Sequence, residues 1–310
     1  MSASSTSKVQ IVSELFESLQ ALIVGRLEAL EPSTKFTHEH FHDSVRGFSH
    51  PCTLAEGKVF EKAAVLFTNA KGEKLPQAAT LNRPHLANQP FAATAISVIV
   101  HPRNPHVPTT HMNLRFFVVH ETTSVWHFGG GFDLTPHIVY EDDARLWHQH
   151  AHEACWSSSQ YSEFKRNCDD YFYLPHRQES RGIGGLFFDD LTLKSFDQCK
   201  NLCASVGNHF ISAYETIVNR RKGITWTSEE EEWMLIRRGR YAEFNLAIDR
   251  GTKYGIQSSR RIESVLASLP PRARWVYGHK PSEDSEMSKS LKYFKPNVNW
   301  ISNVDNLVDK

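Results

Sequence analysis

Residues 101–117 read HPRNPHVPTTHMNLRFF, a proline-containing loop that passes directly into a run of alternating polar and apolar residues. Because successive side chains of a β-strand point to opposite faces, this run predicts a strand with one polar and one apolar face. The polar face would carry His111, Asn113 and Arg115, and the methionine, leucine and phenylalanine between them would face a core. A histidine, an amide and an arginine on one face of a sheet indicate a functional surface.

Further strands are expected on either side of this one. FAATAISVIVH (91–101) and GGLFFDDL (184–191) are apolar runs of strand length, and TSVWHFGGGFDLTP (123–136) predicts a strand that runs into a glycine corner. RYAEFNLAIDRGT (240–252) alternates cleanly and also predicts a strand. Residues 58–70 are ambiguous between strand and helix, and residues 33–58 are expected to be irregular.

Apolar residues spaced three and four apart predict helices in 8–31, 140–156, 195–222 and 227–238, with a short helix within 259–275. Several predicted strands follow one another without a helical crossover. This order favours an α+β fold with an antiparallel sheet over a doubly wound parallel one. We expect a disordered N-terminus over residues 1–8 and a single domain over residues 9–310.

The composition excludes several classes of protein. Lysine and arginine number 35, as do aspartate and glutamate, so that no net charge would attract nucleic acid. No apolar run approaches the about 20 residues that span a bilayer. The five cysteines, Cys52, Cys155, Cys168, Cys199 and Cys203, form no CxxC pair, which is typical of reduced thiols in a reducing compartment. A cytoplasmic protein is expected.

Two groups of residues are candidates for a site. Asp133 follows three consecutive glycines, where the backbone could lie against a flat ligand, although an aspartate after a glycine turn is more often a helix cap or an Asx turn. Arginines at strand ends and helix starts suit a carboxylate, which a guanidinium binds with two parallel hydrogen bonds. These arginines are Arg115, Arg250, Arg260 and Arg261.

The chain has 17 histidines, and several of them could bind a metal ion or transfer protons. No carboxylate stands where an iron-binding triad would need one. Proton transfer or hydrogen bonding within an active site is therefore the stronger interpretation, and a metal site stays the alternative.

Four stretches together resemble the oxygen-dependent coproporphyrinogen III oxidases of haem biosynthesis. They are ATAISVIVHPRNPHVPTTHMNLRFF, WHFGGGFDLTP, DDYFYLPHRQESRGIGGLFFDDL and RRGRYAEFNLAIDRGTKYGIQ followed by RIESVLASLPPRARW. The resemblance implies a large antiparallel sheet flanked by helices on both faces, and a homodimer. It also implies the reaction, in which O2 oxidatively decarboxylates the ring A and B propionates of coproporphyrinogen III to the vinyl groups of protoporphyrinogen IX.

The resemblance also assigns roles to individual residues. The catalytic residues that it implies are His111, similar to the proposed proton donor, Asp133, similar to the aspartate proposed to act at the pyrrole nitrogens, and Asp249, similar to the acid of an acid–arginine pair. Residues similar to substrate contacts are Ser97, Asn113, Leu114, Arg115, Arg250, Ser259, Arg260 and Arg261. The chain departs from the family pattern in two places, with His127 after Trp126 and with the run SSRR at 258–261.

The resemblance leaves the question of a cofactor open. His101, His111, His148 and His176 stand where bacterial relatives bind a divalent metal, whereas other members need neither a metal nor an organic cofactor. Our expectation is that none is required beyond O2 as co-substrate. Two alternatives remain, a metal-dependent oxygenase that uses these histidines and a tetrapyrrole-binding protein without catalytic activity.

Overall fold

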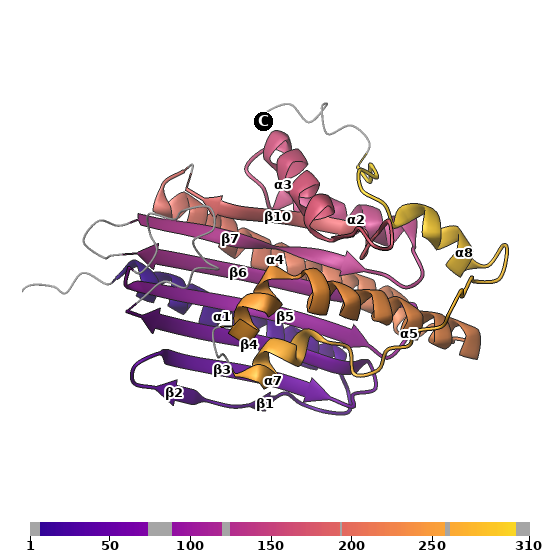
Figure 1. The fold of residues 1–310 in the computed structure, drawn as a ribbon, viewed down its shortest axis with the longest axis horizontal. Helices are drawn as coiled ribbons and strands as arrows, with labels where there is room; N and C mark the ends of the chain where they lie inside the picture. Colours follow the sequence, from indigo (N-terminus) through magenta and orange to yellow (C-terminus); the bar gives the residue numbers. More distant parts are fainter. Residues whose placement is uncertain (1–6, 74–88, 120–124, 193, 258–260, 302–310) are drawn as a thin grey trace, which may run out of the picture.

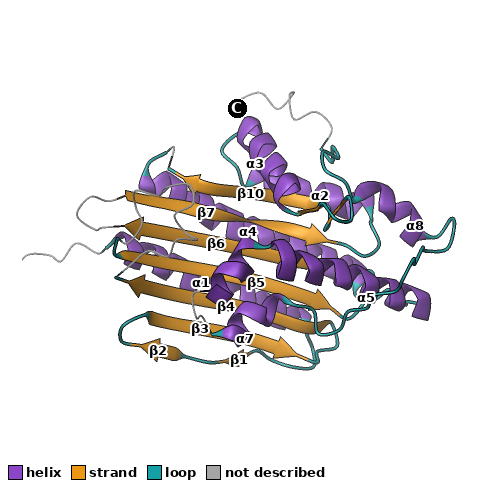
Figure 2. Ribbon diagram, viewed as in Figure 1, coloured by secondary structure: helices purple, strands orange, loops and turns teal. Residues whose placement is uncertain are grey.

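A computed structural model of the protein describes residues 7–73, 89–119, 125–192, 194–257 and 261–301. Its centre is an eight-stranded sheet in the order β1-β3-β4-β5-β6-β7-β10, with β2 paired to β3, and every pair of neighbours is antiparallel. The strands are β1 (Thr37–His38), β2 (Phe41–Asp43), β3 (Gly47–Ala55), β4 (Phe60–Gly72), β5 (Phe91–Pro102), β6 (Thr109–Val119), β7 (Val125–Thr135) and β10 (Gly184–Leu191). The predicted α+β class is confirmed (Figure 2).

Helices cover both faces of the sheet (Figure 1). On one face α1 (Lys8–Leu30) and α4 (Phe196–Arg221) pack against the central strands, and α2 (Glu141–Glu153) packs on α4. The other face carries α5 (Ser228–Glu243), the π-helical turn η3 (Phe244–Ile248), α6 (Arg250–Gln257), α7 (Ile262–Val265) and the 3-10 turn η4 (Leu266–Ser268). We call the face covered by α1 and α4 the core face, and the face that carries α5 to η4 the open face.

The remaining elements lie beside the sheet. α3 (Ser158–Tyr171) packs along the edge strand β10, and β8 (Tyr173–Leu174) pairs with β9 (Glu179–Ser180) in a small separate hairpin. α8 (Glu286–Ser290) and the 3-10 turn η5 (Leu291–Tyr293) close the described part of the chain. No helix in the described ranges is long and apolar enough to cross a membrane.

The alternation in residues 111–117 is confirmed. Met112, Leu114 and Phe116 are fully buried in the main core on the core face, whereas the residues between them are partly exposed on the open face. The ambiguous stretch 58–70 lies mainly in β4, and residues 33–58 are not irregular, because they include β1, β2 and β3. α1 begins at Lys8, one residue before the predicted start of the domain, and residues 1–6 lie outside the described ranges.

The prediction of a strand over residues 240–252 is wrong. This stretch finishes α5, continues through one π-helical turn and begins α6. Tyr241, Phe244 and Ile248 are also spaced three and four apart, so the same apolar residues fit a helix. Two of them pack against a buried guanidinium, described below, and this tertiary contact overrides the local alternation.

The prediction of a glycine corner at 129–131 is also wrong, because β7 continues through the glycines to Thr135. Gly130 and Gly131 have φ values of 148° and 147°, which favour glycine. A Cβ on Gly130 would lie 2.1 Å from the carbonyl oxygen of Asn113, and one on Gly131 would lie 2.0 Å from that of Leu186. The glycines therefore allow the backbones of β6 and β10 to approach, and they do not form a turn.

Candidate active site

The predicted polar triad lies on the open face of the sheet. His111 is paired across the strands with Ile99 on one side and Asp133 on the other, and Ile99 packs beneath Tyr241 of α5. Next along the sheet, Asn113 is paired with Ser97, and both side chains are partly exposed. The alternation correctly predicts that His111, Asn113 and Arg115 share this surface, and strand pairing adds Ser97 to it.

Asp133 holds His111 at the centre of this surface. Its Oδ1 lies 3.0 Å from His111 Nδ1, and Asp133 itself is only 1% exposed. Because an ionised carboxylate can only accept hydrogen bonds, Nδ1 carries the proton and donates it. The His111 side chain is 23% exposed, and no other described residue forms a hydrogen bond with its Nε2. His111 is therefore the member of the pair that can reach a ligand.

A buried arginine balances the charge of Asp133. Arg181 Nη2 donates to both oxygens of Asp133 at 2.8 Å, and Arg181 Nη1 donates to Asn245 Oδ1 at 3.0 Å. The guanidinium lies against the rings of Phe172, Tyr241 and Phe244, with centroid distances of 4.2, 4.3 and 4.7 Å. Ring faces attract a desolvated cation, so this environment stabilises a charge that would otherwise be costly to bury.

The pKa of Asp133 reflects these contacts. Burial acts to raise the pKa, but the Arg181 charge and the His111 hydrogen bond outweigh it and hold the pKa below its ordinary value. Asp133 is thus an ionised, fully engaged carboxylate within β7, two residues before the strand ends, and it caps no helix. The alternative interpretation of Asp133 as a helix cap or turn residue is wrong.

Two arginines meet beside this central pair. Arg115 Nη2 donates to Asp189 Oδ1 at 2.6 Å, Arg250 Nη2 donates to Asp189 Oδ2 at 3.2 Å, and Arg115 Nη1 donates to Asn113 Oδ1 at 3.2 Å. Gly129 leaves room for the Arg115 guanidinium, since a Cβ there would lie 2.8 Å from Nη2. The two guanidinium groups therefore face one carboxylate, in an arrangement that suits a carboxylate ligand equally well.

Asp249 is occupied by local structure. Its Oδ2 accepts from the backbone N–H and the hydroxyl of Thr252 at 2.7 and 2.9 Å, which caps the start of α6. Its Oδ1 accepts from the Tyr171 hydroxyl at 2.8 Å. Asp249 thus positions the next residue, Arg250. The sequence predicted that Asp249 is a catalytic acid, but in the structure both of its oxygens already accept hydrogen bonds.

The predicted arginine set is divided in the structure. Arg261 lies over the Phe41 ring at 3.7 Å and pairs with Glu263. Phe41 belongs to β2, at the edge of the sheet opposite to β10. Ser259 and Arg260 lie outside the described residues. Leu114 points into the core and is fully buried, so its side chain cannot contact a ligand on the open face.

The four histidines predicted as a metal site do not come together. His101 hydrogen-bonds with Thr109 and with the carbonyl oxygen of Ser268, His111 with Asp133, His148 with Tyr161 and with the carbonyl oxygen of Ile183, and His176 with Glu243. Burial lowers the pKa of His148 to about 3. Moreover, α2 carries His148 on the core face, whereas His101 packs against Tyr241 on the open face. The prediction that these four residues form one ligand set is wrong.

Sequence reasoning missed three residues of this surface. Arg181 lies in the loop that leads into β10, Asp189 is a charged residue at the end of an apolar strand, and Tyr171 ends α3. The pair of aspartates in LFFDDL was the available signal for Asp189. Nothing local distinguishes Arg181 from a surface arginine.

Comparison with known protein families gives a match over nearly the whole chain. The model of the coproporphyrinogen III oxidase family matches residues 11–300, which include every described residue of the surface built above. The chain therefore belongs to the coproporphyrinogen III oxidase family, and it is an oxidoreductase that carries out an oxidative decarboxylation in porphyrin biosynthesis.

Proposed function

We propose that this enzyme is of the oxygen-dependent kind and converts the ring A and B propionates of coproporphyrinogen III to vinyl groups. In each step a C–H bond and the bond to the carboxylate break, a carbon–carbon double bond forms and CO2 leaves. O2 takes the two electrons, the hydrogen of the broken C–H bond supplies one proton and the solvent a second, and H2O2 leaves. The observation that carries the proposal is the His111–Asp133 pair on a partly exposed sheet face, beside two arginines that converge on one carboxylate.

The arginine cluster supports binding of a propionate. Arg115 and Arg250 are 32% and 55% exposed, and a carboxylate of the substrate can join or replace Asp189 between them. Ser97 and Asn113 offer further hydrogen bonds along the same face. Arg261, near the opposite edge of the sheet, would bind a second carboxylate, as expected for a ring that carries propionates around its rim.

The central pair supports proton transfer by His111. Since Asp133 fixes the Nδ1–H tautomer, Nε2 is left as an acceptor that can take a proton from the substrate and return it. Direct contact between Asp133 and the pyrrole N–H groups was expected from the sequence, but its oxygens face Arg181 and His111. We therefore propose that Asp133 orients His111 through its Nδ1–H, and that His111 meets the substrate.

The distribution of cysteines favours O2 over a radical mechanism with an iron–sulfur cluster. Such a cluster needs several cysteines around one point. Here the cysteines are dispersed over β3, α3, α4 and the loop after α2, and no group of them with metal-binding spacing occurs in the described ranges. The electrons can come from the reduced tetrapyrrole itself, so we propose that no metal or organic cofactor is required.

One assay separates this proposal from its alternatives. Purified enzyme with coproporphyrinogen III should release CO2 and H2O2 and form the divinyl product in air, and it should form no product without O2. A tetrapyrrole-binding protein without activity would bind substrate and consume no O2. A metal-dependent oxygenase would lose activity after chelation and regain it with metal.

Arg115→Lys is expected to lower kcat/KM about tenfold or more. Lysine keeps the charge but loses the planar fork whose two nitrogens contact Asn113 and a carboxylate, and a charge-assisted contact is worth roughly 1.5–3 kcal/mol. Arg26→Lys is the matched control, since Arg26 forms a single half-exposed ion pair with Glu215 of α4 on the core face. Equal loss in both variants, or none in Arg115→Lys, would argue against the role of Arg115 in binding.

We also propose that the enzyme is a homodimer. Residues 240–249 and the short helix that follows resemble the dimerisation region of the family. In this part of the chain Leu246, Ile256 and Ile262 expose 53%, 52% and 45% of their surface. Sedimentation should give twice the mass of the chain at micromolar concentration. Leu246→Glu should shift the equilibrium toward monomer, and a wild-type monomer would contradict the proposal.

A cytoplasmic location is part of the same proposal. All five cysteines are unpaired, and four of them are buried, as is typical of proteins from a reducing compartment. Fractionation of the native cells, with detection of the untagged chain, tests this location.

A further inference from the structure

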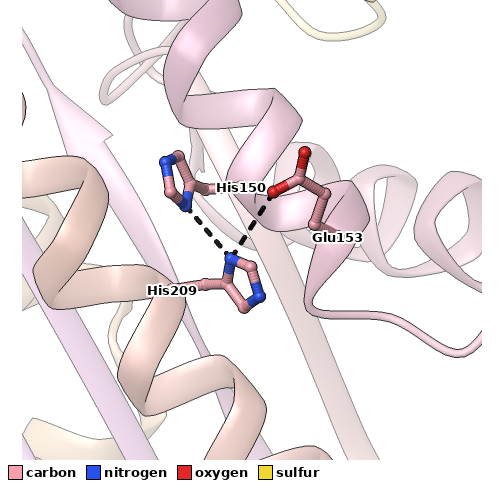
Figure 3. Close-up of side chains that lie close together, drawn as sticks. All are labelled: His150, Glu153 and His209. Carbon is pink, nitrogen blue, oxygen red and sulfur yellow. Dashed lines mark hydrogen bonds and ion pairs between the residues drawn. The ribbon is translucent and has the colours of Figure 1, made fainter.

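We propose that His150, Glu153 and His209 form a binding site for a divalent transition-metal ion, separate from the active site. The three residues lie on the core-face side of the molecule, where α2 packs on α4, and Figure 3 shows their side chains pointing toward one another. The site involves none of the residues on the open face, and it does not depend on the proposed function.

The distances between the three side chains are close to those between the ligands of a bound ion. His150 Nδ1 and His209 Nδ1 lie 3.0 Å apart, and a carboxylate oxygen of Glu153 lies 3.9 Å from His209 Nδ1. One ligand atom from each residue falls within 4.8 Å of the others. Tetrahedral ligands at 2.0–2.1 Å from zinc are separated by roughly 3.3–3.4 Å, so changes of roughly 0.3–1.5 Å in these separations, which side-chain torsions can supply, would bring the three atoms around one ion.

The chemistry of the three groups also points to a cation. Two Nδ1 atoms that face one another cannot both carry a proton, so at least one presents a lone pair toward the other ring. Glu153 uses its other oxygen to accept a hydrogen bond from Gln149 at 3.0 Å, which leaves Oε2 directed at the histidines. Gln149 thus orients Glu153 by a hydrogen bond, in the way that the residues around known metal sites orient the side chains that bind the ion.

The class of ion follows from the ligand types. Two imidazoles and one carboxylate suit Zn²⁺ and Co²⁺ rather than Mg²⁺ or Ca²⁺, which prefer oxygen ligands. Glu153 is 45% exposed and His209 28%, so that water can occupy a fourth position. His150 and Glu153 are three residues apart on one helix, which places both side chains on the face toward α4.

The ion would join two helices that are already linked by ion pairs where α2 begins. Asp143, in the first turn of α2, pairs with Arg220 and Arg221 at the C-terminal end of α4, at 3.1 and 2.6 Å. The histidine pair is the corresponding contact near the end of α2. Metal binding should therefore stabilise the packing of α2 on α4, since a ligand that binds only the folded state raises its stability.

Calorimetric titration of the untagged, metal-free protein with Zn²⁺ alone tests the site. We expect one high-affinity ion per chain and a rise in melting temperature. His209→Ala and His150→Ala should each weaken binding by at least the roughly 10–100-fold that loss of an outer partner costs, and Glu153→Gln should also weaken it. Alanine is the best helix former, so the helices should persist in the first two variants.

His152→Ala is the matched control, because His152 lies on the same helix and its Nε2 hydrogen-bonds with Ser158, away from the site. Its affinity for Zn²⁺ should match that of the wild type. Co²⁺ should give the visible absorption of a four-coordinate ion in the wild type and lose it in His209→Ala. Binding weaker than about 100 µM, or equal affinity in the wild type and His209→Ala, would overturn the proposal.

Discussion

Asp133→Asn is expected to destabilise the fold by about 3–5 kcal/mol. The change leaves Arg181, of which 2% of the side chain is exposed, without its counter-charge, and an unpaired buried charge has this cost. An amide also offers one acceptor oxygen where Arg181 and His111 now use two. Denaturant unfolding measures the difference. A free energy of unfolding within about 1 kcal/mol of the wild type would contradict the buried pair.

Asp189→Asn is the matched control for this prediction. It makes the same substitution on the neighbouring strand, but Asp189 and Arg115 are each 32% exposed, and ion pairs at such sites contribute about 0–1 kcal/mol. The two variants should therefore differ by several kcal/mol. Asparagine caps helices about as well as aspartate, so a residue that only capped would show no such difference.

The dependence of stability on pH reports the same pair in the wild type. Because the pKa of Asp133 is lowered in the folded state, its contribution is fully present above the unfolded pKa of about 3.8. That contribution is lost as the pH falls through the lower, folded value. The stability of the wild type should thus decrease more steeply below pH 4 than that of Asp133→Asn. Parallel curves would show that Asp133 is not ionised in the folded protein.

His111→Gln is expected to lower turnover by about 10²–10⁴ while the fold is retained. Glutamine keeps a hydrogen bond to Asp133 but cannot transfer a proton, and general acid–base catalysis contributes about this factor. The variant should still bind coproporphyrinogen III in the absence of O2, because the arginines that would hold the propionates are unchanged. Fixed-time assays of product formation measure turnover, and the melting temperature of the same variant shows whether the fold is retained.

His50→Gln is the control for His111. His50 also lies on a strand, pairs with a carboxylate, Glu17, at 3.8 Å, and is 28% exposed, but its partner belongs to α1 on the core face. Its turnover should stay close to that of the wild type. Near-normal turnover in His111→Gln, or an equal loss in His50→Gln, would remove His111 from the mechanism.

Much of the sheet could be predicted from the sequence because strand alternation is a local property. The run from His111 to Phe117 shows which side chains face the core, and the runs 91–101 and 184–191, also predicted as strands, are strands in the structure. The stretch 240–252 could not be assigned in this way. Its apolar residues fit both a period of two and a helical spacing, and packing of Tyr241 and Phe244 around Arg181 selects the helix.

The sequence by itself determined that His111, Asn113 and Arg115 share one polar face, because the direction of side chains on a strand follows from the backbone alone. Only the tertiary structure decided what each of them meets. Arg181 reaches Asp133 across 48 residues of chain, and Asp189 reaches Arg115 across 74, through the pairing of β7 with β10. The same pairing order separates Arg261 from the other arginines, and the position of α2 on the core face separates His148 from His101. Residues far apart in sequence meet only where the sheet and its helices bring them together.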